Sequence, residues 1–158
     1  MGSDIFFEKF VESNLRIINR ICRAYASDSE EMKDYVQEVT IQLWKSYEKF
    51  KGDSQVSTWV YRVTLNVCLS LSKKGERRVK TVSALPNDVM PDAHDPKHEQ
   101  LEKLYAGIKK LKDTERAILL LYLEDKSYKE IADILGITVT NVGAKVNRAK
   151  TQLKSIIL

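Results

Sequence analysis

Apolar residues recur at three- and four-residue steps along most of the chain, a spacing that predicts α-helices. In the N-terminal half this spacing predicts helices over about residues 4–26, 27–50 and 57–74. In the C-terminal half it predicts a helix from about residue 99, another over 113–124, and two short helices within 127–153. No strand-like alternation persists, so we expect an all-α protein.

Each predicted helix carries one apolar stripe that we expect to be buried. On the first helix the stripe consists of Phe7, Val11, Leu15, Ile18, Cys22 and Tyr25. On the helix from residue 99 it consists of Leu101, Leu104, Tyr105, Ile108 and Leu111. Ser27 with Glu30 is expected to cap the second helix.

Prolines and acidic residues interrupt the helical pattern between the two halves of the chain. Pro86, Pro91 and Pro96 fall in a segment with weak periodicity, which is typical of a linker. We therefore predict two small domains joined by a flexible linker. Residues 1–75 form a helical bundle, residues 76–98 form the linker, and residues 99–158 form a helix-turn-helix domain.

The stretch from residue 127 to 153 carries the sharpest local signals. Ser127 followed by Glu130 predicts a capping box at a helix start. Gly136 stands where a helix end favours a left-handed residue, and Thr138 can cap the next helix. Two short helices joined by a glycine turn are typical of the helix-turn-helix DNA-binding motif.

Polar and basic residues occupy the face of the last helix that its apolar stripe leaves exposed. From Thr138 to the end of the sequence there are four basic residues and no acidic ones. Lys and Arg can contact phosphates, and Asn, Gln and Arg can pair with base edges in the major groove. The alternative is an ordinary helical hairpin with a solvated basic face.

Charge is concentrated in two places, although the formal net charge is only +4. One place is the C-terminal stretch from Thr138. The other is the segment from Arg62 to Lys80, which contains six basic residues and one acid, Glu76. Two separate positive segments indicate two contacts with a polyanion.

Several other classes of protein are disfavoured by the sequence. There is no run of eighteen apolar residues and no recognisable signal peptide, so we expect a cytoplasmic protein without membrane insertion. No phosphate-binding loop, nucleophile motif or Cys/His cluster occurs, so we expect no catalysis, no cofactor and no metal. His94 and His98 fit a solvated linker better than a metal site. Cys22 and Cys68 fit reduced core residues, with a disulfide as the alternative.

Two segments carry a resemblance to a known family. The stretch DYVQEVTIQLWKSYEKFKGDSQVSTWVYRVTLNVCLSLSKK is similar to region two of bacterial sigma factors. The stretch LKDTERAILLLYLEDKSYKEIADILGITVTNVGAKVNRAKTQL is similar to region four. A short chain with only these two regions resembles the extracytoplasmic-function class.

This resemblance implies a transcription initiation factor that binds core RNA polymerase, directs it to promoters and helps to melt promoter DNA. It implies contacts with the β′ clamp helices and the β flap of polymerase, and control by an anti-sigma factor. In the family, the β′ clamp helices are bound by a polar helix face of region two. The matching positions are Asp34, Gln37, Glu38, Gln42 and Trp44.

The resemblance also implies two sets of DNA contacts. The downstream promoter element and the melted bases would be met by Lys51, Ser54, Ser57, Trp59, Tyr61, Arg62, Asn66, Lys73, Lys74, Arg77 and Arg78. A core position is the competing interpretation for Trp59. The upstream element would be met by Thr140, Asn141, Gly143, Ala144, Lys145, Asn147 and Arg148. Gly143 and Ala144 depart from the common family pattern, which puts the promoter sequence in doubt. The alternative function is a stand-alone LuxR-like transcriptional regulator.

Overall fold

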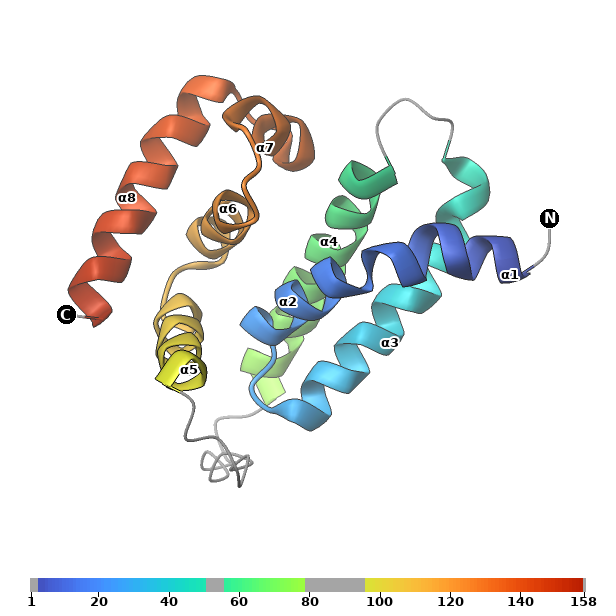
Figure 1. Cartoon of the computed structure of the whole chain (residues 1–158), viewed down its shortest axis with the longest axis horizontal. Coiled ribbons are helices and arrows are strands. Elements are labelled where there is room, and N and C mark those ends of the chain that lie inside the picture. Colours follow the sequence, from blue (N-terminus) through green and yellow to red (C-terminus); the bar gives the residue numbers. More distant parts are fainter. Residues whose placement is uncertain (1–2, 51–55, 79–95, 158) are drawn as a thin grey trace. The chain divides into compact units, whose positions relative to one another are not determined.

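The computed structural model describes residues 3–50, 56–78 and 96–157, and every element in these ranges is helical (Figure 1). The all-α prediction is confirmed. The chain divides into two compact units, Met1–Leu85 and Pro86–Leu158, which are described separately below. Within the described ranges, no helix combines the length and the apolar character that crossing a membrane requires.

The first unit is built mainly from three helices that pack against one another (Figure 1). They are α2 (Leu15–Tyr25), α3 (Ser29–Ser46) and α4 (Val56–Arg78). A short 3₁₀ segment, η3 (Tyr47–Lys49), follows α3. Fully buried side chains from all three helices form the core, among them Ile18, Val39, Leu43 and Val60.

The N-terminal segment does not form the single helix that the apolar spacing predicted. It comprises α1 (Ser3–Phe6), a π-helical segment η1 (Phe7–Val11) and a 3₁₀ segment η2 (Glu12–Asn14) before α2 begins. A π-turn closes hydrogen bonds over five residues instead of four, so the buried stripe changes register here. Phe7 is consequently 52% exposed and Leu15 is also exposed, whereas both were expected to be buried.

The start of α3 lies two residues later than predicted. The cap is Asp28, whose Oδ1 accepts from the Glu31 backbone N–H at 2.8 Å. The Glu31 carboxylate in turn accepts from the backbone N–H of Ser27 at 3.2 Å and from its hydroxyl at 3.0 Å. Asp28 and Glu31 therefore cap this helix in place of Ser27 and Glu30, and the Glu31 carboxylate reaches back to Ser27, the residue before the cap.

Helices extend into both ends of the segment that was predicted to be a linker. Helix α4 continues to Arg78, four residues beyond its expected end. Helix α5 (Pro96–Lys109) begins at a proline, which suits the first helical position because its missing N–H needs no partner there. Residues 79–95, including His94, lie outside the described residues.

The second unit consists of α5, α6 (Asp113–Leu123), α7 (Tyr128–Leu135) and α8 (Val139–Ile157). Helix α8 packs against the other three. The approach of α5 to α8 is close, because a Cβ added at Gly107 would lie 3.0 Å from Leu153 Cδ1 and 3.2 Å from Ile157 Cγ1. Leu101, which was expected in the core, is exposed.

Arg116 ties the turn between α5 and α6 together. Its Nη2 donates to the carbonyl oxygen of Lys109 at 2.6 Å and to that of Leu111 at 3.0 Å. The side chain is buried, so these charged hydrogen bonds act away from water. The N-cap of α6 is Lys112, which makes no side-chain capping bond, and Asp113 is the first residue of the helix.

Candidate nucleic-acid and polymerase interfaces

The helix-turn-helix in the second unit is held by the local contacts that the sequence predicted. Ser127 Oγ accepts from the Glu130 backbone N–H at 3.1 Å and donates to the Glu130 carboxylate at 3.2 Å. Gly136 ends α7 with φ of 70°, in the left-handed region. Thr138 Oγ1 accepts from the Asn141 backbone N–H at 3.1 Å, which caps the start of α8.

Helix α8 buries one face and presents the other. Val142, Val146 and Ala149, which recur at helical spacing, are fully buried. The opposite face exposes five of the seven proposed upstream-element residues. These are Thr140, Asn141, Ala144, Asn147 and Arg148. No acidic residue occurs on this helix, so its exposed face offers a phosphate backbone only hydrogen-bond donors, neutral groups and positive charge.

The remaining two residues of this set, Gly143 and Lys145, are half-buried. Gly143 faces the ring of Tyr128, because a Cβ added there would lie 3.5 Å from that ring. Lys150 does not belong to the open face: its Nζ lies 4.3 Å from the ring centroid of Tyr122 on α6. The hydrogen bond to Tyr122 raises the pKa of the Lys150 ammonium.

The proposed polymerase-binding residues of α3 separate into two groups. Asp34, Gln37 and Trp44 are exposed and follow one another at helical spacing along an outer stripe. Ile41, which the sequence analysis did not select, is exposed between Gln37 and Trp44 on the same stripe. Trp44 is 48% exposed, so an aromatic surface large enough for a protein contact is available here.

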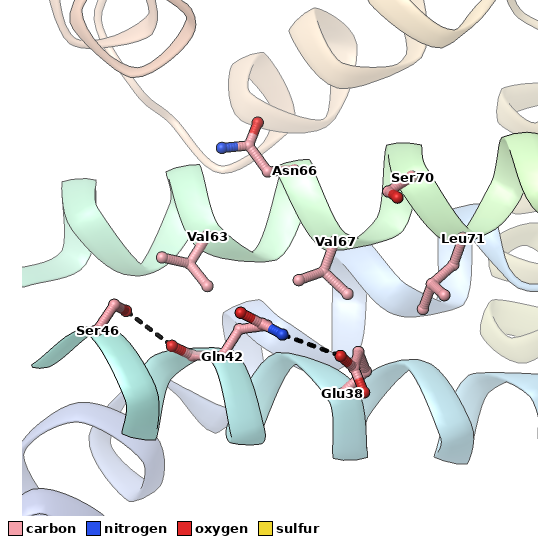
Figure 2. Close-up of a pocket in the computed structure, with 8 residues that line it drawn as sticks. All are labelled: Glu38, Gln42, Ser46, Val63, Asn66, Val67, Ser70 and Leu71. Atoms are coloured by element: carbon pink, nitrogen blue, oxygen red, sulfur yellow. Dashed lines mark hydrogen bonds between the residues drawn. The ribbon is translucent and has the colours of Figure 1, made fainter.

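Glu38 and Gln42 instead face α4, where they line a groove of about 440 Å³. Gln42 Nε2 donates to Glu38 Oε1 at 3.0 Å, and Ser46 Oγ donates to the Gln42 carbonyl at 2.7 Å (Figure 2). Val63, Val67 and Leu71 of α4 point toward α3 and form the apolar side of the groove (Figure 2). The α3 side of the groove is therefore polar, and the α4 side combines these apolar residues with Asn66 and Ser70.

Helix α4 exposes a polar stripe on its outer side. Arg62, Asn66 and Lys73 are exposed, and Ser70 is exposed in line with them. Figure 2 shows Asn66 pointing away from α3, and Asn66 and Ser70 both also line the groove. This arrangement brings three of the proposed downstream contacts onto one continuous face; Ser57, in the first turn of α4, is half-buried.

Tyr61, another of the proposed downstream contacts, is buried in the structure. It is 1% exposed, because it lies on the same side of α4 as Val60, Thr64 and Cys68, which are all buried. Its ring is therefore packed within the first unit and is not available to stack on a base. The prediction that Tyr61 contacts DNA was wrong for this reason.

Trp59 is half-buried within an aromatic cluster. Its ring lies 5.2 Å from the ring of Phe10 and 5.2 Å from the ring of Phe50, measured between centroids. The packing interpretation of Trp59 is thus supported, while part of the side chain stays accessible.

Other predicted contacts fall outside the described residues or side chains. Lys51 and Ser54 lie outside the described residues, and nothing is described of the side chains of Lys74, Arg77 and Arg78. Across residues 3–50, 56–78 and 96–157, no three His, Cys, Asp or Glu side chains come together in a way that would hold a metal ion. His98 lies 3.7 Å from Glu102 on α5.

Cys22 and Cys68 are free thiols in the core of the first unit, between α2 and α4. Their sulfur atoms lie 3.7 Å apart. The hydrogen bond to Cys22 and burial raise the pKa of Cys68 well above its ordinary value. A thiol that stays protonated is a poor nucleophile, so Cys68 is not suited to covalent chemistry. Both side chains are fully buried and contribute to the packing of the core.

Comparison with known families accounts for both units. Residues 10–78 match the model of sigma-70 region 2, and residues 101–153 match that of sigma-70 region 4. The chain belongs to the sigma-70 family. The two matched regions are those of a family of non-catalytic transcription factors. The match over residues 10–78 also disfavours a stand-alone LuxR-like regulator.

Individual relatives agree with this assignment. The chain is 29% identical over 180 residues to the ECF RNA polymerase sigma factor SigG of Mycobacterium tuberculosis, covering 95% of this chain and 48% of that protein. It thus spans about half the length of that relative. It is 25% identical over 167 residues to SigW of Bacillus subtilis, covering 97% of this chain and 89% of SigW.

The fold also resembles a solved structure, the co-crystal structure of the sigma factor RpoE with the anti-sigma factor NepR from Bartonella quintana. The TM-score is 0.74, at 18% identity, over 97% of each chain.

Proposed function

We propose that this chain is a transcription initiation factor, which binds core RNA polymerase, directs it to specific promoters and helps to open promoter DNA. The single observation that carries the proposal is the presence of both matches, region 2 and region 4, in this order in one chain. We place this activity in the cytoplasm, where bacterial transcription takes place.

We infer that the outer stripe of α3 binds the β′ clamp helices of polymerase. The stripe consists of Asp34, Gln37, Ile41 and Trp44. An exposed tryptophan beside an isoleucine, bordered by a carboxylate and an amide, suits a basic protein surface with a hydrophobic centre. Glu38 and Gln42 extend this surface into the adjacent groove.

We infer that the outer face of α4 contacts the downstream promoter element. Arg62 and Lys73 can neutralise phosphates, and Asn66 can pair with an unstacked base. Ser57 and the accessible part of Trp59 lie toward the start of α4, where a captured base would stack. We propose further contacts with the same promoter element at Lys51, Ser54, Lys74, Arg77 and Arg78.

We infer that the exposed face of α8 reads the upstream element in the major groove. Arg148, Asn141 and Asn147 can pair with base edges, and Lys145 is suited to a phosphate. Thr140 and Ala144 offer small exposed groups that allow close approach, and Gly143, which is half-buried against Tyr128, lies beside them. Two weak contacts in one chain reinforce each other, because binding of one unit raises the effective concentration of the other.

Run-off transcription with core polymerase tests this function. The full chain is mixed with core enzyme and with DNA fragments enriched by the reconstituted holoenzyme. A promoter-dependent transcript that requires the chain is the expected result. No transcript on any enriched fragment, despite active core enzyme, would sink the proposal. Tight, polymerase-independent binding to a symmetric operator would instead support the stand-alone regulator.

We also infer control by an anti-sigma factor. The solved structure of RpoE, which shares the fold, is a complex with such a protein. A partner of this kind is expected to inhibit run-off transcription when added before core polymerase. Excess core polymerase should relieve the inhibition, and a partner that inhibits equally at every polymerase concentration would contradict this mode of control.

A further inference from the structure

The first unit contains an aromatic cluster that joins three parts of the chain. Phe10 comes from η1, and Trp59 comes from the first turn of α4. Tyr47 begins the η3 segment that follows α3, and Phe50 comes directly after η3. We call these four side chains the aromatic cluster.

Phe10 occupies the centre of the aromatic cluster. Its ring centroid lies 5.2 Å from that of Trp59, 6.0 Å from that of Phe50 and 6.2 Å from that of Tyr47. The contacts to Trp59 and Phe50 are edge-to-face, with interplanar angles of 78°. Edge-to-face pairs at these separations are the favourable geometry for aromatic rings. Phe10 therefore contacts every other member of the cluster.

The π-helical turn explains why Phe10 can take this position. Within η1, both Phe10 and Val11 are buried, with exposures of 6% and 3%. The π-turn adds a residue to the helical repeat, and Phe7, three residues before Phe10, remains at the surface. Single π-turns are common at functional sites, because their irregular backbone persists only where it is held by other contacts.

The aromatic cluster lies between the two surfaces to which we assign function. Trp44, on the outer stripe of α3, is 6.0 Å from Tyr47 between ring centroids. On the other side, Arg62 and Asn66 follow Trp59 by one and two helical turns along α4. Phe10 thus supports the end of the proposed polymerase-binding helix and the start of the proposed DNA-binding helix.

We propose that Phe10 is a positioning residue for promoter opening. It contacts no DNA itself. By holding Trp59 and Phe50, it fixes the first turn of α4 in the orientation from which Trp59, Arg62 and Asn66 meet unstacked bases. This inference rests on the proposed function, and it adds a role for the N-terminal segment, which the sequence analysis treated only as part of a buried helix.

An ordinary core residue would behave differently from a positioning residue. Loss of a core residue lowers the amount of folded protein, which reduces activity equally on every template. Loss of a positioning residue reduces the opening step, so a promoter that is already open should restore activity. A template with a mismatched bubble at the melting site provides this distinction.

The experiment compares Phe10→Ala with the matched control Val11→Ala, using the full chain and core polymerase. Val11 is equally buried on the same segment but has no ring to stack. Open-complex formation is measured on a duplex promoter and on the same promoter with a mismatched bubble. We expect Phe10→Ala to reduce open-complex formation at least tenfold on the duplex promoter and less than twofold on the promoter with the bubble. Val11→Ala should change open-complex formation by the same factor on both templates.

Two further variants keep the test decisive if Phe10→Ala folds poorly. Phe10→Leu retains an apolar side chain without the ring and should show the same template-dependent loss. Phe10→Tyr retains the ring and should restore opening of the duplex promoter. Equal losses on both templates, no loss on the duplex, or a failure of Phe10→Tyr to restore opening would each overturn the inference. A wild-type chain inactive on both templates would instead overturn the proposed function.

Discussion

The two units of this chain are both small helical domains, but different interactions determine their structures. In the second unit, local contacts fix the element ends: Ser127 and Thr138 cap helices, and Gly136 supplies the left-handed turn. In the first unit, contacts between residues far apart in the sequence determine how the helices are placed. The aromatic cluster, which joins residues 10, 47, 50 and 59, is an example. A helix-turn-helix can thus be determined by contacts between neighbouring residues, whereas a surface composed of several helices requires tertiary contacts.

The largest effect on stability should come from Arg116, whose side chain holds the turn between α5 and α6 through bonds that span only seven and five residues. Arg116→Ala removes two charged hydrogen bonds to the carbonyls of Lys109 and Leu111. Each such bond contributes about 1.5–3 kcal/mol. We expect the free energy of unfolding to fall by about 3 kcal/mol, measured by urea denaturation. Arg148→Ala is the control; it should change stability by less than about 0.5 kcal/mol, because the side chain is exposed.

Substitution of Arg148 should weaken promoter binding without lowering the stability of the second unit, the reverse of the effect expected for Arg116. If Arg148 makes a bidentate base contact, Arg148→Ala should weaken promoter binding by about 1–3 kcal/mol, with a loss of discrimination at one base position. If Lys145 contacts phosphate, Lys145→Ala should weaken binding on all sequences and reduce the salt slope by about 1. Holoenzyme binding to promoter variants at several salt concentrations measures both. Unchanged binding in both variants would rule out α8 as the reader.

Two glycines of the second unit provide a matched pair. Gly136 has φ of 70° with open space around its Cβ position, so Gly136→Ala should cost about 1 kcal/mol from backbone strain alone. Gly143 lies inside α8, where an added Cβ would make an ordinary contact with Tyr128. Gly143→Ala should therefore stabilise the unit by up to about 1 kcal/mol. Equal effects of the two changes would show that the turn geometry is not the constraint.

The smallest expected effect concerns the pH dependence of the first unit. Burial, and then the hydrogen bond to Glu31, raise the pKa of Tyr35 above its ordinary value of 10.0. A raised pKa means that the folded state favours the neutral phenol, so this stabilisation is complete below pH 10 and is lost as the pH rises further. Urea denaturation of the wild type should show a steeper loss of stability above pH 10 than Tyr35→Phe. Identical slopes would contradict this account.

The sequence predicted the second unit more accurately than the first for the same physical reason. Caps and left-handed turns depend on a few neighbouring residues, so Ser127, Gly136 and Thr138 could be placed correctly without a structure. The exposed face of α8 followed from the spacing of Val142, Val146 and Ala149.

Predictions for the first unit were accurate where the helical spacing was regular and wrong where tertiary packing changed it. The π-turn at η1 broke the predicted stripe, and no local signal indicated it. Tyr61 was assigned to the DNA surface from the resemblance, although it lies beside Val60 in the core. Ile41, which is exposed, was missed because the polymerase-binding residues were chosen as positions that match a polar helix face in the family.

The buried thiols of Cys22 and Cys68 have a practical consequence for fluorescence measurements. Since maleimide dyes react with accessible thiolates, the native pair should stay unlabelled in the folded protein. New cysteines can therefore be introduced at exposed positions, such as Glu30 in the first unit and Thr151 in the second, without replacing either native residue. Energy transfer between dyes at these positions would report the distance between the two units as transcription begins.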